Sequence, residues 1–142
     1  DLVVITLDRT LNYQKLEIAK SAINKGAKYY SANMDATCPV SGGEILDAGA
    51  IISALSKATN KTPTKNFGKP SGYMFSAIEE KLNFNKQSTL IIGDRLETDI
   101  KMGNDFGIDT ALVATGIPKT FTNDLIIKPN YKLHSVIEII LE

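Results

Sequence analysis

Short apolar runs alternate along the chain with stretches in which apolar residues recur every three or four positions. The continuous runs over residues 2–7, 27–32, 89–92, 108–114 and 131–133 predict strands. The periodic stretches predict helices from Asn12 to Gly26, from Asp47 to about residue 58, from Pro70 to about residue 82, over 100–106, and from Ser135. Continuous apolar strands that alternate with helices are typical of a parallel sheet, so the predicted fold class is α/β.

Polar stretches interrupt this pattern. Residues 33–43 contain Asn, Asp, Pro and two glycines and predict a loop of about ten residues, a length often associated with function. Residues 59–66 are polar, contain Pro63 and predict a connector, so we expect two parts, residues 1–63 and 64–142. Residues 115–129 are expected to form a loop or a short helix.

Composition narrows the function classes. With 43% hydrophobic and 23% charged residues, the 142-residue chain has the balance of a soluble globular protein. Sixteen basic residues face sixteen acidic ones, so charge gives no reason to expect nucleic acid or an anionic membrane as partner. No apolar run approaches the ~18 residues of a membrane span. One cysteine, Cys38, excludes an internal disulfide and fits a reducing cytoplasm, the expected location.

One candidate site begins at the end of a predicted strand. Asp94 follows the apolar run and Gly93 directly, and Asp99 comes five positions later, in the first turn of a predicted helix. Ligands of open α/β sheets bind beyond the carboxyl ends of the strands, and carboxylates there suit Mg²⁺. The alternative is that Asp94 caps the helix and Asp99 is a solvated acid.

A second candidate is the run Phe67-Gly68-Lys69-Pro70. Gly68 allows the backbone to approach a ligand closely. Because Pro70 is expected to begin a helix, Lys69 would lie at a helix N-terminus, which is unfavourable for a cation unless an anion such as phosphate is nearby. The alternative is an ordinary exposed lysine.

The two motifs together, one helix apart, resemble motifs three and four of the haloacid dehalogenase superfamily. Residues 3–13, 32–39 and 47–50 look like the second half of the cap in its p-nitrophenylphosphatase-like subfamily, subclass IIA, and residues 93–100 are similar to that subfamily's last motif. The resemblance covers nearly every residue from Val3 onward. Where the subfamily often has Pro-Gly, this chain has Ile45-Leu46-Asp47, which is expected to change only a helix entry.

The resemblance implies a Mg²⁺-dependent phosphatase acting on a small phosphorylated metabolite. Residues 64–142 would be the C-terminal half of a Rossmann-like core, and residues 1–63 part of an α/β cap. Lys69 would bind the transferred phosphate, Asp94 would ligate Mg²⁺, and Asp99 would support the metal through water or a hydrogen bond. The substrate would lie near a continuous segment, Arg95, Leu96, Glu97 and Thr98. Asn33 and Asp35 would face the leaving group or serve as turn residues.

One departure from the family is important. The family attacks phosphorus with an aspartate of an Asp-x-Asp motif, and this chain contains no such pair. The first hypothesis is therefore a C-terminal fragment of such an enzyme, inactive alone. The second is a non-catalytic module that retains affinity for metal or phosphate. An incomplete sheet would expose an apolar edge, so a homodimer is also an expectation.

A third hypothesis concerns residues 6–11, which imitate an Asp-x-Asp-Gly-Thr-Leu pattern with Thr6 in place of the nucleophile. On this hypothesis the chain would be a small capless relative without a working nucleophile. The helix and loop that follow Thr10 match the cap better. Two other reactive residue types have no suitable neighbours: His134 is expected to be structural or exposed to solvent, and Cys38 an unreactive thiol.

Overall fold

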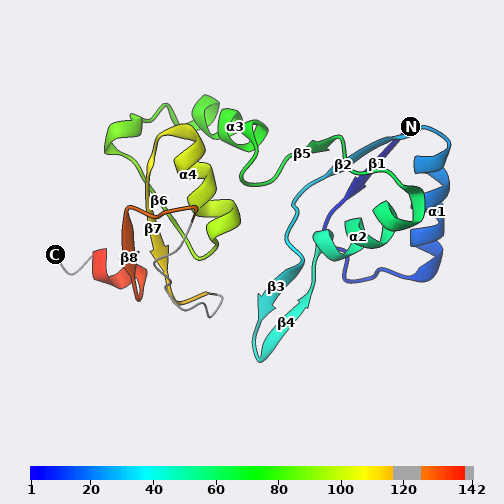
Figure 1. The fold of residues 1–142 in the computed structure, drawn as a ribbon, viewed down its shortest axis with the longest axis horizontal. Helices are drawn as coiled ribbons and strands as arrows, with labels where there is room; N and C mark the ends of the chain where they lie inside the picture. The colour runs from blue at the N-terminus through cyan, green and yellow to red at the C-terminus, as the bar shows by residue number, and fades with distance from the viewer. Residues whose placement is uncertain (117–125, 140–142) are drawn as a thin grey trace. The chain divides into compact units, whose positions relative to one another are not determined.

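The computed structural model describes residues 1–116 and 126–139, which belong to two compact units, Asp1–Gly68 and Lys69–Glu142. Each unit contains a three-stranded parallel sheet with helices beside it (Figure 1). The predicted α/β class with parallel strands is confirmed. Among the described residues, no helix is both long and apolar enough to cross a membrane.

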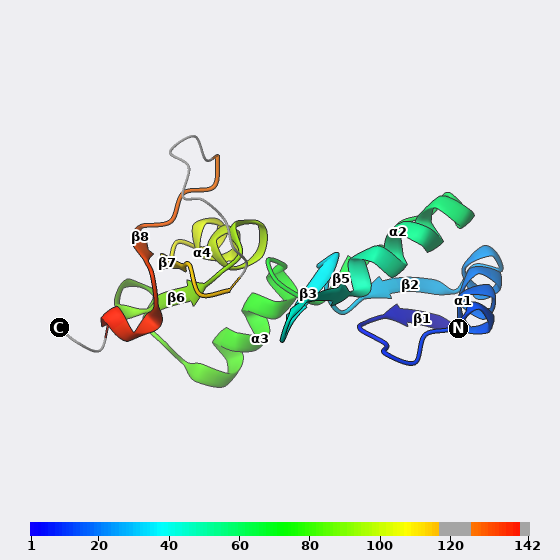
Figure 2. The ribbon, with the colours of Figure 1, turned by 90° about the horizontal axis from the view of Figure 1, so that it is seen from below.

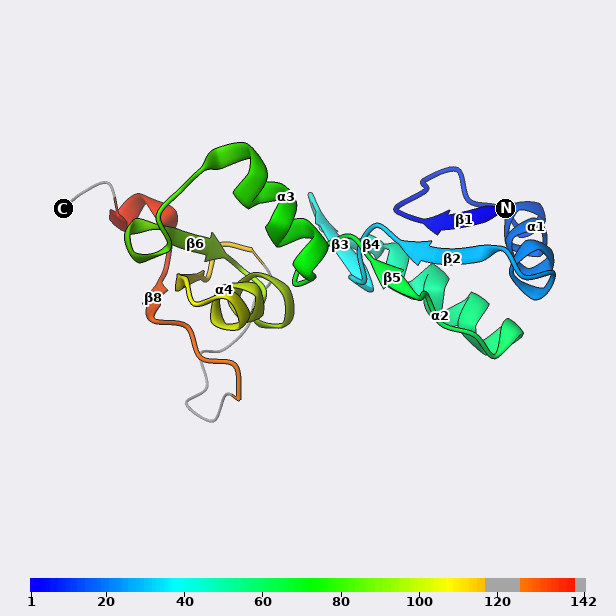
Figure 3. The ribbon, with the colours of Figure 1, turned by 90° about the horizontal axis from the view of Figure 1, so that it is seen from above.

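The sheet of the first unit has the order β1-β2-β5. Strands β1 (Leu2–Ile5) and β2 (Lys28–Ser31) run side by side, as Figure 3 shows, and both were predicted. Strand β5 (Lys65–Asn66) pairs with the end of β2. It lies in the stretch predicted to be a connector, and that prediction was wrong at these positions. A two-residue strand is too short to produce a hydrophobic pattern, so only its pairing partner defines it.

Two helices of the first unit begin where the sequence places their caps. Helix α1 (Tyr13–Asn24) begins after Asn12, whose side chain accepts the Lys15 N–H at 2.9 Å. Helix α2 (Ala48–Thr59) begins after Asp47, whose carboxylate accepts the Ala48 N–H at 2.6 Å. The chain leaves α1 through Gly26 with φ of 96°, a conformation that favours glycine.

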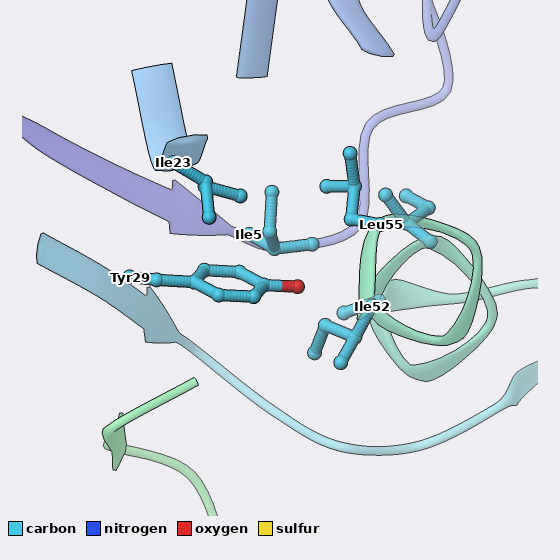
Figure 4. Close-up of a cluster of buried hydrophobic side chains, with 7 residues drawn as sticks. Ile5, Ile23, Tyr29, Ile52 and Leu55 are labelled. Carbon is cyan, nitrogen blue, oxygen red and sulfur yellow. The ribbon is translucent and has the colours of Figure 1, made fainter. Parts of the chain in front are cut away.

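Both helices pack their apolar faces onto β1 and β2. Figure 4 shows the resulting cluster, in which Ile5 and Tyr29 from the strands meet Ile23 of α1 and Ile52 and Leu55 of α2. These five side chains are at most 8% exposed. Burial also raises the pKa of the Tyr29 hydroxyl.

A β-hairpin occupies most of the predicted loop at residues 33–43. Strands β3 (Thr37–Val40) and β4 (Gly43–Leu46) are antiparallel, with Cys38 opposite Ile45. The loop prediction was therefore wrong beyond residue 36. Pro39 and the two glycines suggested irregular backbone, but a proline is tolerated in a strand of such a two-stranded ribbon, where one edge is unpaired. Gly42, with φ of 87°, forms the tight turn.

The described part of the second unit contains three strands, all predicted, in the order β6-β7-β8. They are β6 (Leu90–Gly93), β7 (Asp109–Val113) and β8 (Tyr131–Leu133). Helix α4 (Lys101–Phe106) lies beside β7 in Figure 2 and ends at Gly107, whose φ is 70°. Where a helix was expected from Ser135, the described residues form a 3₁₀ turn, Val136–Ile139, and residues 140–142 lie outside the described residues. Of the predicted loop or short helix at 115–129, residues 117–125 lie outside the described residues.

Helix α3 (Gly72–Leu82) begins later than predicted. Ser71 is its N-cap, because the serine hydroxyl accepts the Met74 N–H at 3.3 Å. Pro70 therefore precedes the cap instead of forming the first turn, since a serine cap fixes the start of the helix one residue after itself. Phe75 of α3 stacks on Phe106 of α4 at 4.0 Å between ring centroids, and this pair anchors the core of the second unit.

Candidate functional site

Asp94 is the first residue after β6, at the carboxyl end of that strand. It is half-buried, and the N-cap position of the helical turn that follows is Arg95. The chain passes from Arg95 into a π-helical turn, Leu96–Ile100, which continues as α4. The sequence predicted a turn up to Thr98 and a helix from Ile100. Turns of the π type are rare and are frequent at functional sites.

Asp99 is the most buried acid of this segment, with only 7% of its side chain exposed. Its Oδ1 lies 2.5 Å from the Lys69 ammonium, and its Oδ2 accepts the Arg95 N–H at 3.2 Å. The alternative of a solvated first-turn acid is therefore wrong. A buried carboxylate needs such partners, because an unpaired one would lose its hydration without compensation.

The positive charge of Lys69 is balanced by Asp99, whereas the sequence analysis expected a helix N-terminus and a bound anion beside it. Because α3 begins at Gly72, Lys69 lies two residues before the Ser71 cap and not at the first turn. Its side chain is 45% exposed, and its ammonium group pairs with Asp99 instead. Asp99 therefore connects both motifs: one oxygen binds Lys69, and the other binds the N–H next to Asp94. Nearly half of the Lys69 side chain is exposed beside this pair.

Two glycines make room for the two carboxylates. A Cβ on Gly93 would overlap the Asp99 side chain, and a Cβ on Gly116 would overlap that of Asp94. Gly116 comes three residues after β7, so it lies at the carboxyl end of the neighbouring strand. The sequence analysis did not single out Gly116. A glycine shortly after a buried strand was the available indication, but nothing local shows which side chain it faces.

The four residues expected near the substrate lie in or next to the π-helical turn. Arg95 and Leu96 are half-buried, Glu97 is exposed and Thr98 is buried. The Thr98 hydroxyl has no hydrogen-bond partner within the described part of the chain. Glu97 is thus the residue of this group with the greatest access to solvent.

Asn33 and Asp35 belong to the first unit, whereas Lys69, Asp94 and Asp99 belong to the second. The Asn33 amide nitrogen lies 3.4 Å from Oδ1 of Asp47, and the Asp35 carbonyl accepts the Gly49 N–H at 2.7 Å. These contacts tie the loop to the start of α2. They give both residues a local structural role of the kind expected for turn residues.

The third hypothesis placed a missing nucleophile at Thr6. Thr6 and Asp8 both line a cleft of about 620 Å³ beside β1 and α1. The Asp8 carboxylate accepts from Lys15 and from Thr10, each at 2.7 Å. The Lys15 hydrogen bond, followed by those from Thr10, lowers the pKa of Asp8 from 3.8 to about 2. This acid is engaged within its own loop by Thr10 and Lys15, and Thr6 itself has no carboxylate with which to attack phosphorus.

Within residues 1–116 and 126–139, no group of three or more His, Cys, Asp or Glu side chains is arranged to hold a metal ion. The chain offers carboxylate oxygens at Asp94, with Asp99 behind it. Mg²⁺ is commonly held by one or two carboxylates, with water and substrate phosphate supplying its other oxygens. The donor set is therefore suited to part of a Mg²⁺ site, with Asp94 as ligand. Asp99 is less suited to direct ligation, because both of its oxygens already accept hydrogen bonds.

The backbone before Lys69 is fixed by a residue that the sequence analysis also missed. The Asn66 side chain accepts the Gly68 N–H and donates to the Gly68 carbonyl, each at 3.1 Å. Its Oδ1 also accepts from Ser31, which is fully buried. Asn66 lay in a predicted connector, where an asparagine usually indicates a turn and gives no hint of such a bracket.

Two carboxylates and a lysine thus lie near the carboxyl end of a parallel strand. Proteins similar to this chain identify its family. Residues 66–139 match the family described as HAD-hydrolase-like. The chain belongs to the haloacid dehalogenase superfamily of hydrolases, in its p-nitrophenylphosphatase-like subclass IIA.

Individual relatives support the assignment. An acid sugar phosphatase of Staphylococcus epidermidis is 39% identical over 117 residues, which are 82% of this chain and 45% of that protein. The structure of 4-nitrophenylphosphatase from Thermotoga maritima superposes with a TM-score of 0.88 at 33% identity, covering 99% of this chain and 54% of that one. Glycerol phosphate phosphatase from Mycobacterium tuberculosis, solved with magnesium, gives 0.80 at 31% identity, covering 93% and 40%. The chain spans about half the length of the curated relatives it matches.

Proposed function

We propose that the protein to which this chain belongs is a Mg²⁺-dependent phosphatase that hydrolyses small phosphomonoesters. The observation that carries the proposal is the double use of Asp99, which binds Lys69 with one oxygen and the backbone next to Asp94 with the other. A phosphate-binding cation and a metal-binding carboxylate are thereby linked at one strand end. The names of the relatives, which include an acid sugar phosphatase and a glycerol phosphate phosphatase, support the substrate class.

Each residue has a distinct part in this proposal. The Lys69 ammonium, held by Asp99, binds oxygens of the transferred phosphoryl group and stabilises negative charge on them. The Asp94 carboxylate holds Mg²⁺, which when bound neutralises phosphoryl charge as a Lewis acid. Asp99 orients Lys69 and also fixes the start of the turn at Arg95. The segment from Arg95 to Thr98 faces the substrate, with Glu97 exposed.

The chain's share of the reaction is binding and charge stabilisation. Covalent phosphoryl transfer in this superfamily needs a nucleophilic aspartate, and these 142 residues contain no Asp-x-Asp pair. That absence favours a second candidate function for the chain taken alone: binding of Mg²⁺ and phosphate without hydrolysis. Both candidates use Lys69 and Asp94 in the same roles.

Hydrolysis of p-nitrophenyl phosphate by the natural gene product tests the proposal. We expect activity that EDTA abolishes and Mg²⁺ restores. Lys69→Ala and Asp94→Asn should each lower kcat/KM at least about 100-fold, the usual effect of removing a group that stabilises transition-state charge. Lys101→Ala is the matched control, because Lys101 also pairs with an aspartate, Asp105 at 2.9 Å, but on the exposed face of α4.

The control should keep kcat/KM within about two-fold, since exposed pairs contribute little. Wild-type activity in both Lys69→Ala and Asp94→Asn would exclude the proposal. Mg²⁺-dependent phosphate binding by the 142-residue chain, lost in Asp94→Asn and unaccompanied by hydrolysis in the natural gene product, would select the binding function instead.

A further inference from the structure

Gly116 lies against the carboxylate of Asp94. A Cβ built on Gly116 would overlap the Asp94 Oδ2, Cγ and Cβ atoms. Gly116 itself is exposed, at the end of the described segment that follows β7. The place that a side chain would fill is therefore occupied by the carboxylate.

Backbone conformation does not explain the glycine. Four other glycines of the described chain, Gly26, Gly42, Gly43 and Gly107, have φ in the range that L-residues rarely adopt, and Gly116 does not. An alanine at 116 would therefore fit the backbone without strain. The methyl group of that alanine would, however, overlap the Asp94 side chain.

The neighbour at Gly116 is also a movable one. At Gly103 a Cβ would meet the Thr110 methyl and the Ile108 backbone carbonyl, so a substitution there would disturb the core. At Gly116 the nearest atoms all belong to one half-buried side chain. Rotation of Asp94 to another staggered rotamer would move its carboxylate away from residue 116. The Asp94 Cβ does not move in that rotation, so the exposed backbone at 116 would also have to shift slightly to clear it.

We infer that Gly116 is a positioning residue for Asp94: the bare backbone at 116 selects the rotamer in which the Asp94 carboxylate binds Mg²⁺. The inference rests on the proposed function, which makes Asp94 the metal ligand. Mg²⁺ demands near-ideal octahedral geometry and short metal–oxygen distances. A methyl group that turns the carboxylate away would thus reduce metal affinity without removing any ligand atom.

Titration of the chain with Mg²⁺ alone, followed by calorimetry, tests this role. We expect Gly116→Ala to raise the Kd for Mg²⁺ at least about ten-fold, equivalent to about 1.4 kcal/mol. Gly116→Val should raise it further, because the larger side chain excludes more positions of the carboxylate. The melting temperature in EDTA should stay within about 2 °C of wild type, because the substitution is expected to change the stability of the metal-free fold by less than about 1 kcal/mol. A change of 1 kcal/mol in the free energy of unfolding would move the melting temperature of a domain of this size by about 2–8 °C.

Gly72→Ala is the matched control, because a Cβ there makes only an ordinary 3.8 Å contact with Phe106. It should leave the Kd unchanged. Asp94→Asn serves as the reference for complete loss of the metal ligand. If Asp94→Asn binds Mg²⁺ as wild type does, the proposed metal site is wrong and the inference fails with it. If Asp94→Asn loses binding but Gly116→Ala keeps the wild-type Kd, only the inference is overturned.

A second measurement covers the case in which Gly116→Ala lowers the melting temperature. The carboxyl ¹³C resonance of Asp94, recorded without metal, reports the surroundings of that carboxylate directly. We expect it to shift in Gly116→Ala and to stay in place in Gly72→Ala. An unmoved resonance in Gly116→Ala would show that the methyl group does not displace Asp94, and would refute the positioning role.

Discussion

Lys69 and Asp99 are 30 residues apart in the sequence, yet the Lys69 Nζ atom lies 2.5 Å from Oδ1 of Asp99. The lysine is half-exposed and the aspartate is almost completely buried. The pair therefore serves the fold of the second unit as well as the proposed chemistry, since the buried charge depends on the lysine for compensation.

Replacing Lys69 by Met should destabilise the second unit by about 1–2 kcal/mol, because a buried carboxylate loses its cation while water still reaches the site. Adding Asp99→Asn to that variant should restore part of the loss, since no charge is then left buried. Urea unfolding with hydrogen exchange measured on β6 and β7 checks both values. Strictly additive effects of the two substitutions would contradict the coupling. The exposed pair Lys101–Asp105 provides the comparison, with an expected coupling below about 0.5 kcal/mol.

Gly93→Ala should destabilise the second unit by about 1–3 kcal/mol, because the added methyl group overlaps the buried Asp99 side chain. Gly72→Ala, at the first position of α3, should instead stabilise it by about 0.4–1 kcal/mol through reduced freedom of the unfolded chain. Thermal unfolding of the two variants beside wild type gives the comparison. Equal melting temperatures for both would argue against the close approach at Gly93.

Asp8 should titrate near pH 2 in the folded chain, below its ordinary pKa of 3.8. Because the folded pKa is the lower one, this group stabilises the fold above pH 3.8 and loses that contribution as the pH falls toward 2. Lys15→Ala should move the pKa of Asp8 upward, since the Lys15 hydrogen bond is the main cause of the shift. Carboxyl ¹³C titration by NMR measures it, with Lys20→Ala as control because Lys20 pairs with Glu17. An Asp8 pKa unchanged in Lys15→Ala would reject this cause.

Asp47→Ala should cost the first unit about 1 kcal/mol, the usual loss when an N-cap acceptor is removed. Asp47→Pro, which approaches the Pro-Gly of the subfamily, should cost more in this chain. A proline would also remove the N–H that donates to the Ala36 carbonyl at 2.9 Å. Thermal unfolding checks the order, with Glu44→Ala, an exposed position of the hairpin, as control. A proline variant as stable as wild type would show that the cap is dispensable.

The strands and helix caps were predictable because they depend on local chemistry. Continuous apolar runs identified β6 and β7, and the side chains of Asn12 and Asp47 identified two helix starts. Each of these elements is defined by neighbours in the sequence, so its pattern is visible without the fold. The α/β class follows from their alternation.

The errors occur where distant residues decide the structure. The hairpin β3–β4 contains Pro39 and has Gly42 and Gly43 at its turn, and it is the pairing between its two strands, such as Cys38 with Ile45, that makes it a ribbon. The π-helical turn between Arg95 and α4 depends on the Asp99 side chain, which returns to the Arg95 N–H. Helix propensities do not distinguish such a turn from the start of an α-helix.

The candidate site divides in the same way. Asp94 and Lys69 were recognisable from residue type and spacing, because carboxylates after strands and lysines in glycine loops are recurrent features of phosphate and metal chemistry. The partnership of Lys69 with Asp99, and the space that Gly116 leaves for Asp94, involve residues 22 to 30 positions apart. A single sequence contains no indication of such distances.

The side-chain amide of Asn66 marks the point at which strand β5 of the first sheet ends. A strand grows by offering a free N–H and a free carbonyl to its neighbour, and one asparagine side chain satisfies both groups of Gly68. The last hydrogen bond to β2 runs from the Phe67 N–H to the Ser31 carbonyl at 2.9 Å, and the pairing of β5 with β2 stops where Asn66 binds Gly68. The lysine that follows is therefore excluded from the pleat, and its long side chain can point to a carboxylate instead of into a layer of packed residues.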